Sequence, residues 1–179
     1  ENKKPITPIT DKAIERVPKV DIAGYSEEQR VEIQKQHKEL LKFSKEQNDN
    51  KEVAFVFRDG LVDYKPFTGS DEKIDFGTYL ETKGKNLTIL HNHPRNSSYS
   101  MNDLDVFANK NVRTITIVKN NGTVEYLTKT DDFDNNRFAL ECNRLYKKIV
   151  VKETDEEKDR FVKTLLNKSK AGVIWSGRK

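Results

Sequence analysis

Short segments rich in β-branched and aromatic residues lie in the middle of this 179-residue chain, and they constrain its fold most strongly. Each segment is only a few residues long and ends at a polar or glycine-containing break, which is typical of strands in a sheet. Asp59-Gly60 and Asn120-Asn121-Gly122 favour tight hairpin turns between neighbouring segments. The predicted strands are 52–57, 61–64, 87–91, 112–119 and 123–128.

Amphipathic helices are predicted on both sides of these strands. Ser26-Glu27-Glu28-Gln29 has the form of a capping box, and an apolar stripe with helical spacing follows it. His37 lies on or beside that stripe, and we interpret it as a packed or hydrogen-bonded structural histidine. Cys142 lies within a later stripe and is interpreted as a small core residue. The predicted helices cover 26–44, 101–109, a segment that starts at Asp134 and a segment around 161–166.

The charge distribution and the single cysteine limit the kinds of site that this chain can build. Residues 147–179 hold ten Lys or Arg and five Asp or Glu, a net charge of +5, so the other residues carry −1 of the total of +4. Because the two signs interleave, this tail is interpreted as a solvated helix face, and phosphate or nucleic-acid binding is the weaker alternative. One cysteine supports neither an internal disulfide nor a multi-thiolate metal site. Any metal site must therefore use His, Asp and Glu.

The termini and the longest breaks define the expected organisation. We expect an extended lead-in at 1–25, a main domain at 26–130 and a helical extension at 131–179. Residues 74–80 are expected to form a short helix or a lid. Trp175 is interpreted as an anchor that folds the tail back, with a partner-binding or cleavable segment as the alternative. No run of apolar residues is long enough to span a membrane, and no signal peptide is visible at Glu1, so we expect a cytoplasmic fragment of a longer polypeptide.

The strongest chemical signal is a His-x-His-Pro sequence at the end of a predicted strand. Alternate side chains of a strand point to the same side, so His91 and His93 are expected to reach one metal ion. Asp103, in the first turn of the next helix, is expected to add a carboxylate oxygen. Two nitrogens and one oxygen leave a tetrahedral position open, as in catalytic zinc sites, where a bound water becomes a nucleophile near neutral pH.

Each part of this pattern also has a simpler interpretation. Ser100-x-x-Asp103 is itself a helix capping box, although capping and metal binding are compatible. Hydrolysis also needs a general base, and Glu52, at the start of the predicted strand 52–57, is the best-placed candidate. A glutamate there could instead be solvated, and Glu81 is nearer in sequence but lies in a loop-like region. The contiguous letters His-Asn-His do not form the dispersed motif of HNH nucleases.

Together, Glu52, His91-x-His93-Pro94 and Ser100-x-x-Asp103 resemble the signature of the JAMM (MPN+/JAB) metalloprotease family over residues 50–130. The resemblance implies an α/β, JAB/MPN-like fold, related to that of cytidine deaminases, with a curved mixed β-sheet flanked by helices. It also implies a zinc ion bound by the two histidines and Asp103, Glu52 as acid and base, and Ser100 as a hydrogen-bond donor to the water or oxyanion. The loop between His93 and Ser100 has six residues, which is short for the family, and lacks a proline before the serine.

The same resemblance implies hydrolysis of an amide or isopeptide bond in a protein or peptide substrate, ubiquitin-like proteins included. The Leu-His-Asn-His-Pro form and the short loop are similar to bacterial and phage members, and 9–42 more loosely resembles the C-terminal part of phage head-morphogenesis proteins. The insertions with which eukaryotic members grip ubiquitin chains are not identified, so ubiquitin itself is not the expected substrate. The alternative is an assembly or binding module of a phage or mobile-element protein, with a structural or vestigial zinc site.

Overall fold

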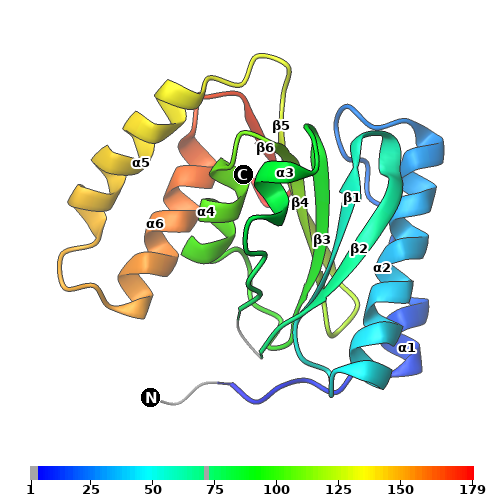
Figure 1. The fold of residues 1–179 in the computed structure, drawn as a ribbon. Helices are drawn as coiled ribbons and strands as arrows, with labels where there is room; N and C mark the ends of the chain where they lie inside the picture. The colour runs from blue at the N-terminus through cyan, green and yellow to red at the C-terminus, as the bar shows by residue number, and fades with distance from the viewer. Residues whose placement is uncertain (1–3, 71–72) are drawn as a thin grey trace.

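The chain folds around one six-stranded mixed sheet with helices on both faces (Figure 1). The computed structural model describes residues 4–70 and 73–179. This mixed sheet with flanking helices confirms the predicted α/β class. The strands are β1 (Val53–Arg58), β2 (Val62–Thr68), β3 (Leu87–His93), β4 (Val112–Lys119), β5 (Val124–Lys129) and β6 (Val173–Trp175). The helices are α1 (Asp11–Glu15), α2 (Glu27–Gln47), α3 (Tyr79–Thr82), α4 (Met101–Ala108), α5 (Asn135–Ile149) and α6 (Asp155–Lys168), with a single 3₁₀ turn η1 (Asp59–Leu61).

The strand order is β2-β1-β3-β4-β5-β6, and only β3 and β4 of the neighbouring strands run parallel. A parallel pair needs a crossover, and α4 supplies it between the end of β3 and the start of β4. The loop that leaves β3 and the first turn of α4 therefore lie together at one end of the sheet. Both predicted hairpins are present, as β1–β2 and β4–β5.

Two hydrophobic cores lie on opposite faces of the sheet. Helices α1 and α2 cover one face, where Ile33, Leu40 and Leu41 of α2 pack with inward residues of β1. Helices α4, α5 and α6 cover the other face, where Phe107, Phe138 and Leu165 belong to a single cluster. Alternate positions of the central strands face opposite cores, so β3 carries Ile89 to the α4 side and Leu90 to the α2 side.

Both terminal segments contain more structure than the sequence patterns predict. The lead-in, expected to be extended, includes α1, and its apolar residues Ile9, Val17 and Ile22 are buried against α2 and the sheet. The C-terminal segment, expected to be helical, also supplies β6, which pairs with β5 at the edge of the sheet. Trp175 is buried in the main core, as the anchor interpretation predicts. No helix in the described part of the chain combines the length and the apolar character that a bilayer crossing requires.

The loop between β2 and β3 differs in extent from the predictions. Strand β2 was expected to end at Tyr64 but continues to Thr68, because it is an edge strand and Pro66 can lie where no ladder hydrogen bond is needed. The short helix expected at 74–80 forms as the single turn α3, which begins at Tyr79 and ends at Thr82. Ile74 and Leu80 bury their side chains in the core on the α4 side. The described part of this loop therefore packs on the sheet.

A candidate metal centre

His91 and His93 lie at the end of β3 and project from the same face of the sheet, toward α4. All seven residues of β3 are buried, and the two histidines are 3% and 6% exposed. Asp103 is 4% exposed and enters the same space from the first turn of α4. The strand alternation that predicted a shared side for the two imidazoles is what places them together.

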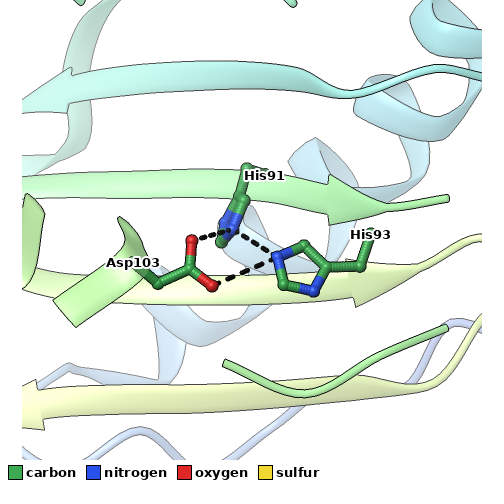
Figure 2. Close-up of side chains that lie close together, drawn as sticks. All are labelled: His91, His93 and Asp103. Atoms are coloured by element: carbon green, nitrogen blue, oxygen red, sulfur yellow. Dashed lines mark hydrogen bonds and ion pairs between the residues drawn. The ribbon is translucent and has the colours of Figure 1, made fainter. Parts of the chain in front are cut away.

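The three side chains meet at one point (Figure 2). The Nε2 atoms of His91 and His93 are 2.9 Å apart. The carboxylate of Asp103 bridges them, with Oδ1 3.0 Å from Nε2 of His91 and Oδ2 3.2 Å from Nε2 of His93. One ligand atom from each residue lies within 4.8 Å of the others, and within residues 4–70 and 73–179 this is the one group of three or more His, Cys, Asp or Glu side chains with that geometry.

Backbone carbonyl groups determine the tautomer of both histidines. Nδ1 of His91 lies 2.7 Å from the carbonyl oxygen of Thr116, and Nδ1 of His93 lies 2.9 Å from that of Ser97. A carbonyl oxygen only accepts hydrogen bonds, so both Nδ1 atoms must carry the hydrogen. In the neutral imidazoles the two Nε2 lone pairs then point at each other and at a carboxylate. Two nitrogens and a carboxylate that converge in this way fit a cation, and the group could hold a metal ion.

Asp103 belongs to a helix capping box and to this group at once. Its backbone N–H donates to Ser100 Oγ at 3.2 Å, and its Oδ2 accepts from the backbone N–H of Ser100 at 2.8 Å. This reciprocal pair is the predicted capping box. Because the box holds the carboxylate at the helix start, both oxygens stay directed at the histidines. The two interpretations of Ser100-x-x-Asp103 therefore apply together.

The electrostatics of the group also favour a positive charge at its centre. Burial lowers the pKa of His91, but the adjacent carboxylate of Asp103 outweighs burial and raises it to about 9, with a smaller contribution from Glu52 in the same direction. Burial raises the pKa of Asp103, and the two histidines reverse this and hold it well below its usual range. Without a metal ion, a proton on His91 supplies the positive charge. A metal cation bound here would displace that proton.

Glu52 and Ser100 lie on the wall of one pocket beside the histidines. The pocket has a volume of about 390 Å³, and His93, Glu52, Ser100 and Asn102 are among its lining residues. Glu52 directly precedes β1 and is 5% exposed, so a fully solvated glutamate is not what the structure shows. Glu81, the alternative in sequence, is exposed on α3. The five predicted site residues are thus close together, with three in the group that could hold a metal ion and Glu52 and Ser100 on the pocket wall.

Several supporting residues were not found by sequence reasoning. Asn92, between the histidines, points to the opposite face, is fully buried and contacts Val53, Lys51 and Asn120. Thr116 and Ser97 orient the two imidazoles through their carbonyl oxygens, which any residue type supplies. No side-chain pattern could have indicated the roles of Thr116 and Ser97. An asparagine inside a strand was the one visible signal, because asparagine is depleted in strands.

The remaining histidine and the cysteine take no part in this centre. His37 is fully buried on α2, and its Nε2 lies 2.7 Å from Oγ1 of Thr116, which confirms the predicted structural histidine. Cys142 is half-buried on α5, and burial raises the pKa of its thiol to about 11. A thiol with such a pKa is neutral and a poor nucleophile.

Comparison with known protein families, curated proteins and solved structures finds no match to this chain.

Proposed function

We propose that this protein is a zinc-dependent metallopeptidase or isopeptidase of the JAMM type, which hydrolyses an amide or isopeptide bond in a protein or peptide substrate. One observation carries the proposal: the group formed by His91, His93 and Asp103 adjoins a pocket whose wall includes Glu52 and Ser100. A buried group with ligands and a cleft with an acid–base candidate are what metal-assisted hydrolysis needs.

The donor set favours zinc among the common metals. Two imidazole nitrogens and one carboxylate suit zinc better than calcium or magnesium, which take mostly oxygen ligands. Three protein ligands are typical of catalytic zinc sites, whereas structural sites use four. When bound, the ion supplies Lewis acidity and lowers the pKa of a coordinated water. The proposed ligands are Nε2 of both histidines and the carboxylate of Asp103.

Glu52 is proposed to move the proton. Its carboxylate takes a proton from the attacking water and returns it to the nitrogen of the leaving amine, so that one group serves as base and then as acid. Its position supports this role, since it lines the pocket together with His93 and its charge acts on His91. The 5% exposure of Glu52 limits competition from bulk water.

Ser100 is proposed to stabilise negative charge on the substrate carbonyl oxygen. Its Oγ already accepts a hydrogen bond from the backbone N–H of Asp103, so its own hydrogen remains free to donate. The capping box holds this hydroxyl at the pocket wall. A donor that is already oriented before the reaction costs little reorganisation during it.

The order of elements supports assignment to a JAB/MPN-like fold. The chain runs from the Glu52-bearing strand through a hairpin to the His-bearing strand, the Ser/Asp helix and two further strands, as the family resemblance implies. Helices cover both faces of the mixed sheet. We propose that residues 26–130 carry the JAB/MPN-like elements, to which the C-terminal segment adds β6. Its proposed partners are substrates of protein nature, ubiquitin-like proteins among them.

Metal analysis combined with unbiased substrate profiling tests the proposal. Purified protein should hold about one zinc ion per chain, removable by a chelator, and a His91→Ala/His93→Ala variant should hold none. Profiling on peptide and ubiquitin-like substrates should detect cleavage by zinc-loaded protein and not by chelated protein. Failure to bind stoichiometric zinc would overturn the proposal. Full zinc occupancy without cleavage of any substrate would instead favour the assembly module with a structural zinc site.

A further inference from the structure

We propose that Glu125 is a positioning residue for the His93 side of the metal centre, and that it couples this centre to the docked C-terminal strand β6 through Trp175. The inference rests on metal binding by the proposed site. Glu125 is on β5, and its carboxylate contacts Ser98, Trp175 and Lys119. It acts through the loop that joins β3 to α4.

The carboxylate of Glu125 is the meeting point of three separate segments. Its Oε1 accepts a hydrogen bond from Ser98 Oγ at 2.8 Å and another from Trp175 Nε1 at 3.0 Å. Its Oε2 lies 2.8 Å from Nζ of Lys119, and both side chains of this ion pair are mostly buried, with 14% and 19% exposure. Burial raises the pKa of Glu125, but Lys119, Trp175 and Ser98 together lower it below its ordinary value. The carboxylate is therefore ionised near neutral pH and attracts all three partners.

Ser98 connects this carboxylate to the metal centre. The preceding residue, Ser97, supplies the carbonyl oxygen that accepts from Nδ1 of His93, and its hydroxyl lies 3.1 Å from the same nitrogen. A shift of Ser98 therefore moves the group that orients His93. The carbonyl that orients His91 belongs to Thr116 in β4, which the sheet holds without help from this loop. Glu125 is thus expected to act on one histidine and not on the other.

Trp175 connects the carboxylate to the C-terminal strand. Strand β6 has three residues and three register pairs with β5, so each side-chain contact contributes substantially to its docking. The indole ring is buried, and its N–H donates to Glu125. Ser176, the next residue, contacts β5 independently, because its Oγ accepts from the backbone N–H of Tyr126 at 2.9 Å. Trp175 and Ser176 thus each hold the C-terminal segment on β5, and only the side chain of Trp175 contacts Glu125.

Zinc affinity in four variants tests the coupling. Trp175→Phe keeps a buried ring and removes the N–H, Ser98→Ala removes the loop contact, and Ser176→Ala is the matched control. We expect Trp175→Phe and Ser98→Ala each to weaken zinc binding by about 10-fold. Changes to residues that support metal ligands weaken binding by about 10- to 100-fold. The low end is expected here because the hydroxyl of Tyr99 also anchors the loop, through the carbonyl oxygen of Ile115. Ser176→Ala should leave affinity within about two-fold. The double variant Trp175→Phe/Ser98→Ala should lose little more than either single variant, since both act through one carboxylate.

A readout without metal separates this inference from the proposed function. In chelated protein, the exchange of the imidazole Nδ1–H of His93 with solvent, followed by NMR, should be faster in Trp175→Phe and Ser98→Ala than in wild type. The Nδ1–H of His91 is the internal control and should not change. If the wild type binds no zinc and the two variants still speed up the exchange of His93 alone, the proposed function is refuted and the coupling is supported. Equal effects on both histidines, strict additivity in the double variant, or an equal effect of Ser176→Ala would overturn the coupling.

Discussion

The backbone N–H of Val53 donates to Oδ1 of Asn92 across 2.7 Å, so the residue between the two histidines holds the start of the strand that follows Glu52. Strands β1 and β3 pair only as far as Ala54 and His91, and the asparagine side chain extends their connection by one residue. Its Nδ2 donates to Oδ1 of Asn120 at 2.8 Å, which ties in the β4–β5 turn. Glu52 and the strand that carries the two histidines are therefore held together from the face of the sheet opposite to the His-His-Asp group.

Asn92→Ala should lower the free energy of unfolding by about 2–3 kcal/mol. The change leaves the N–H of Val53 and the side chain of Asn120 without their buried partner, and buried unsatisfied groups of this kind are costly. Urea denaturation measures the loss. Asn143→Ala, at an exposed position of α5, is the control and should change stability by less than about 0.5 kcal/mol. Equal stability of the two variants would show that the Asn92 contacts contribute nothing.

Glu52→Gln should retain stoichiometric zinc and lose hydrolysis by at least about 100-fold, because the amide cannot take or return a proton. The variant preserves side-chain length at a buried position, so folding should be intact by circular dichroism. The measurement is turnover of whichever substrate profiling identifies, at equal zinc loading. Turnover at the wild-type rate would mean that another group is the base.

Zinc should stabilise the wild type far more than the Asp103→Asn variant. Asparagine keeps an oxygen for the N–H of Ser100, so the helix cap survives, but the charge that attracts a cation is removed. With free zinc about 100-fold above its dissociation constant, the wild type gains about 2.7 kcal/mol, which corresponds to a rise in melting temperature of at least about 5 °C. Asp105→Asn, on the exposed side of the same helix, should behave like wild type. Identical zinc-dependent shifts in all three proteins would exclude Asp103 as a ligand.

The buried histidine on α2 makes stability depend on pH. Burial, with a smaller effect of His91, lowers the pKa of His37 to about 3 from an ordinary value of 6.5. Below pH 6.5 the unfolded chain binds a proton that the folded chain does not, so this contribution to stability is complete above 6.5 and is lost as pH falls toward 3. Between pH 6.5 and 5 the loss amounts to about 2 kcal/mol.

His37→Gln removes this titration and keeps a polar group for Thr116. The difference in unfolding free energy between wild type and variant, measured by urea denaturation of chelated protein at pH 7.5 and pH 5, isolates the contribution of His37. His91, whose raised pKa acts in the opposite direction, is present in both proteins and cancels. A difference that does not change with pH would refute a neutral buried His37.

Local patterns predicted that His91, His93 and Asp103 lie together, and the supporting structure depended on contacts between distant residues. The period of a strand places His91 and His93 on one side, and a capping box holds Asp103, so both features can be read within a few residues. Asn92, Thr116 and Glu125 act through partners that are distant in sequence, and nothing in a short window indicates them. The same distinction applies to the fold, because hairpins follow from turn sequences, whereas the pairing of β6 with β5 depends on where α5 and α6 direct the chain.

The crossover from β3 through α4 also determines which contacts of the site are local in sequence. His91 and Asp103 are twelve positions apart, and a loop of about that length closes within about 10–100 ns in an unfolded chain. The carbonyl of Thr116 lies 25 positions beyond His91, and Glu125 lies 27 positions beyond Ser98. All three residues of the His-His-Asp group thus belong to one local strand–loop–helix unit, whereas the contact that orients His91 depends on the pairing of β3 with β4.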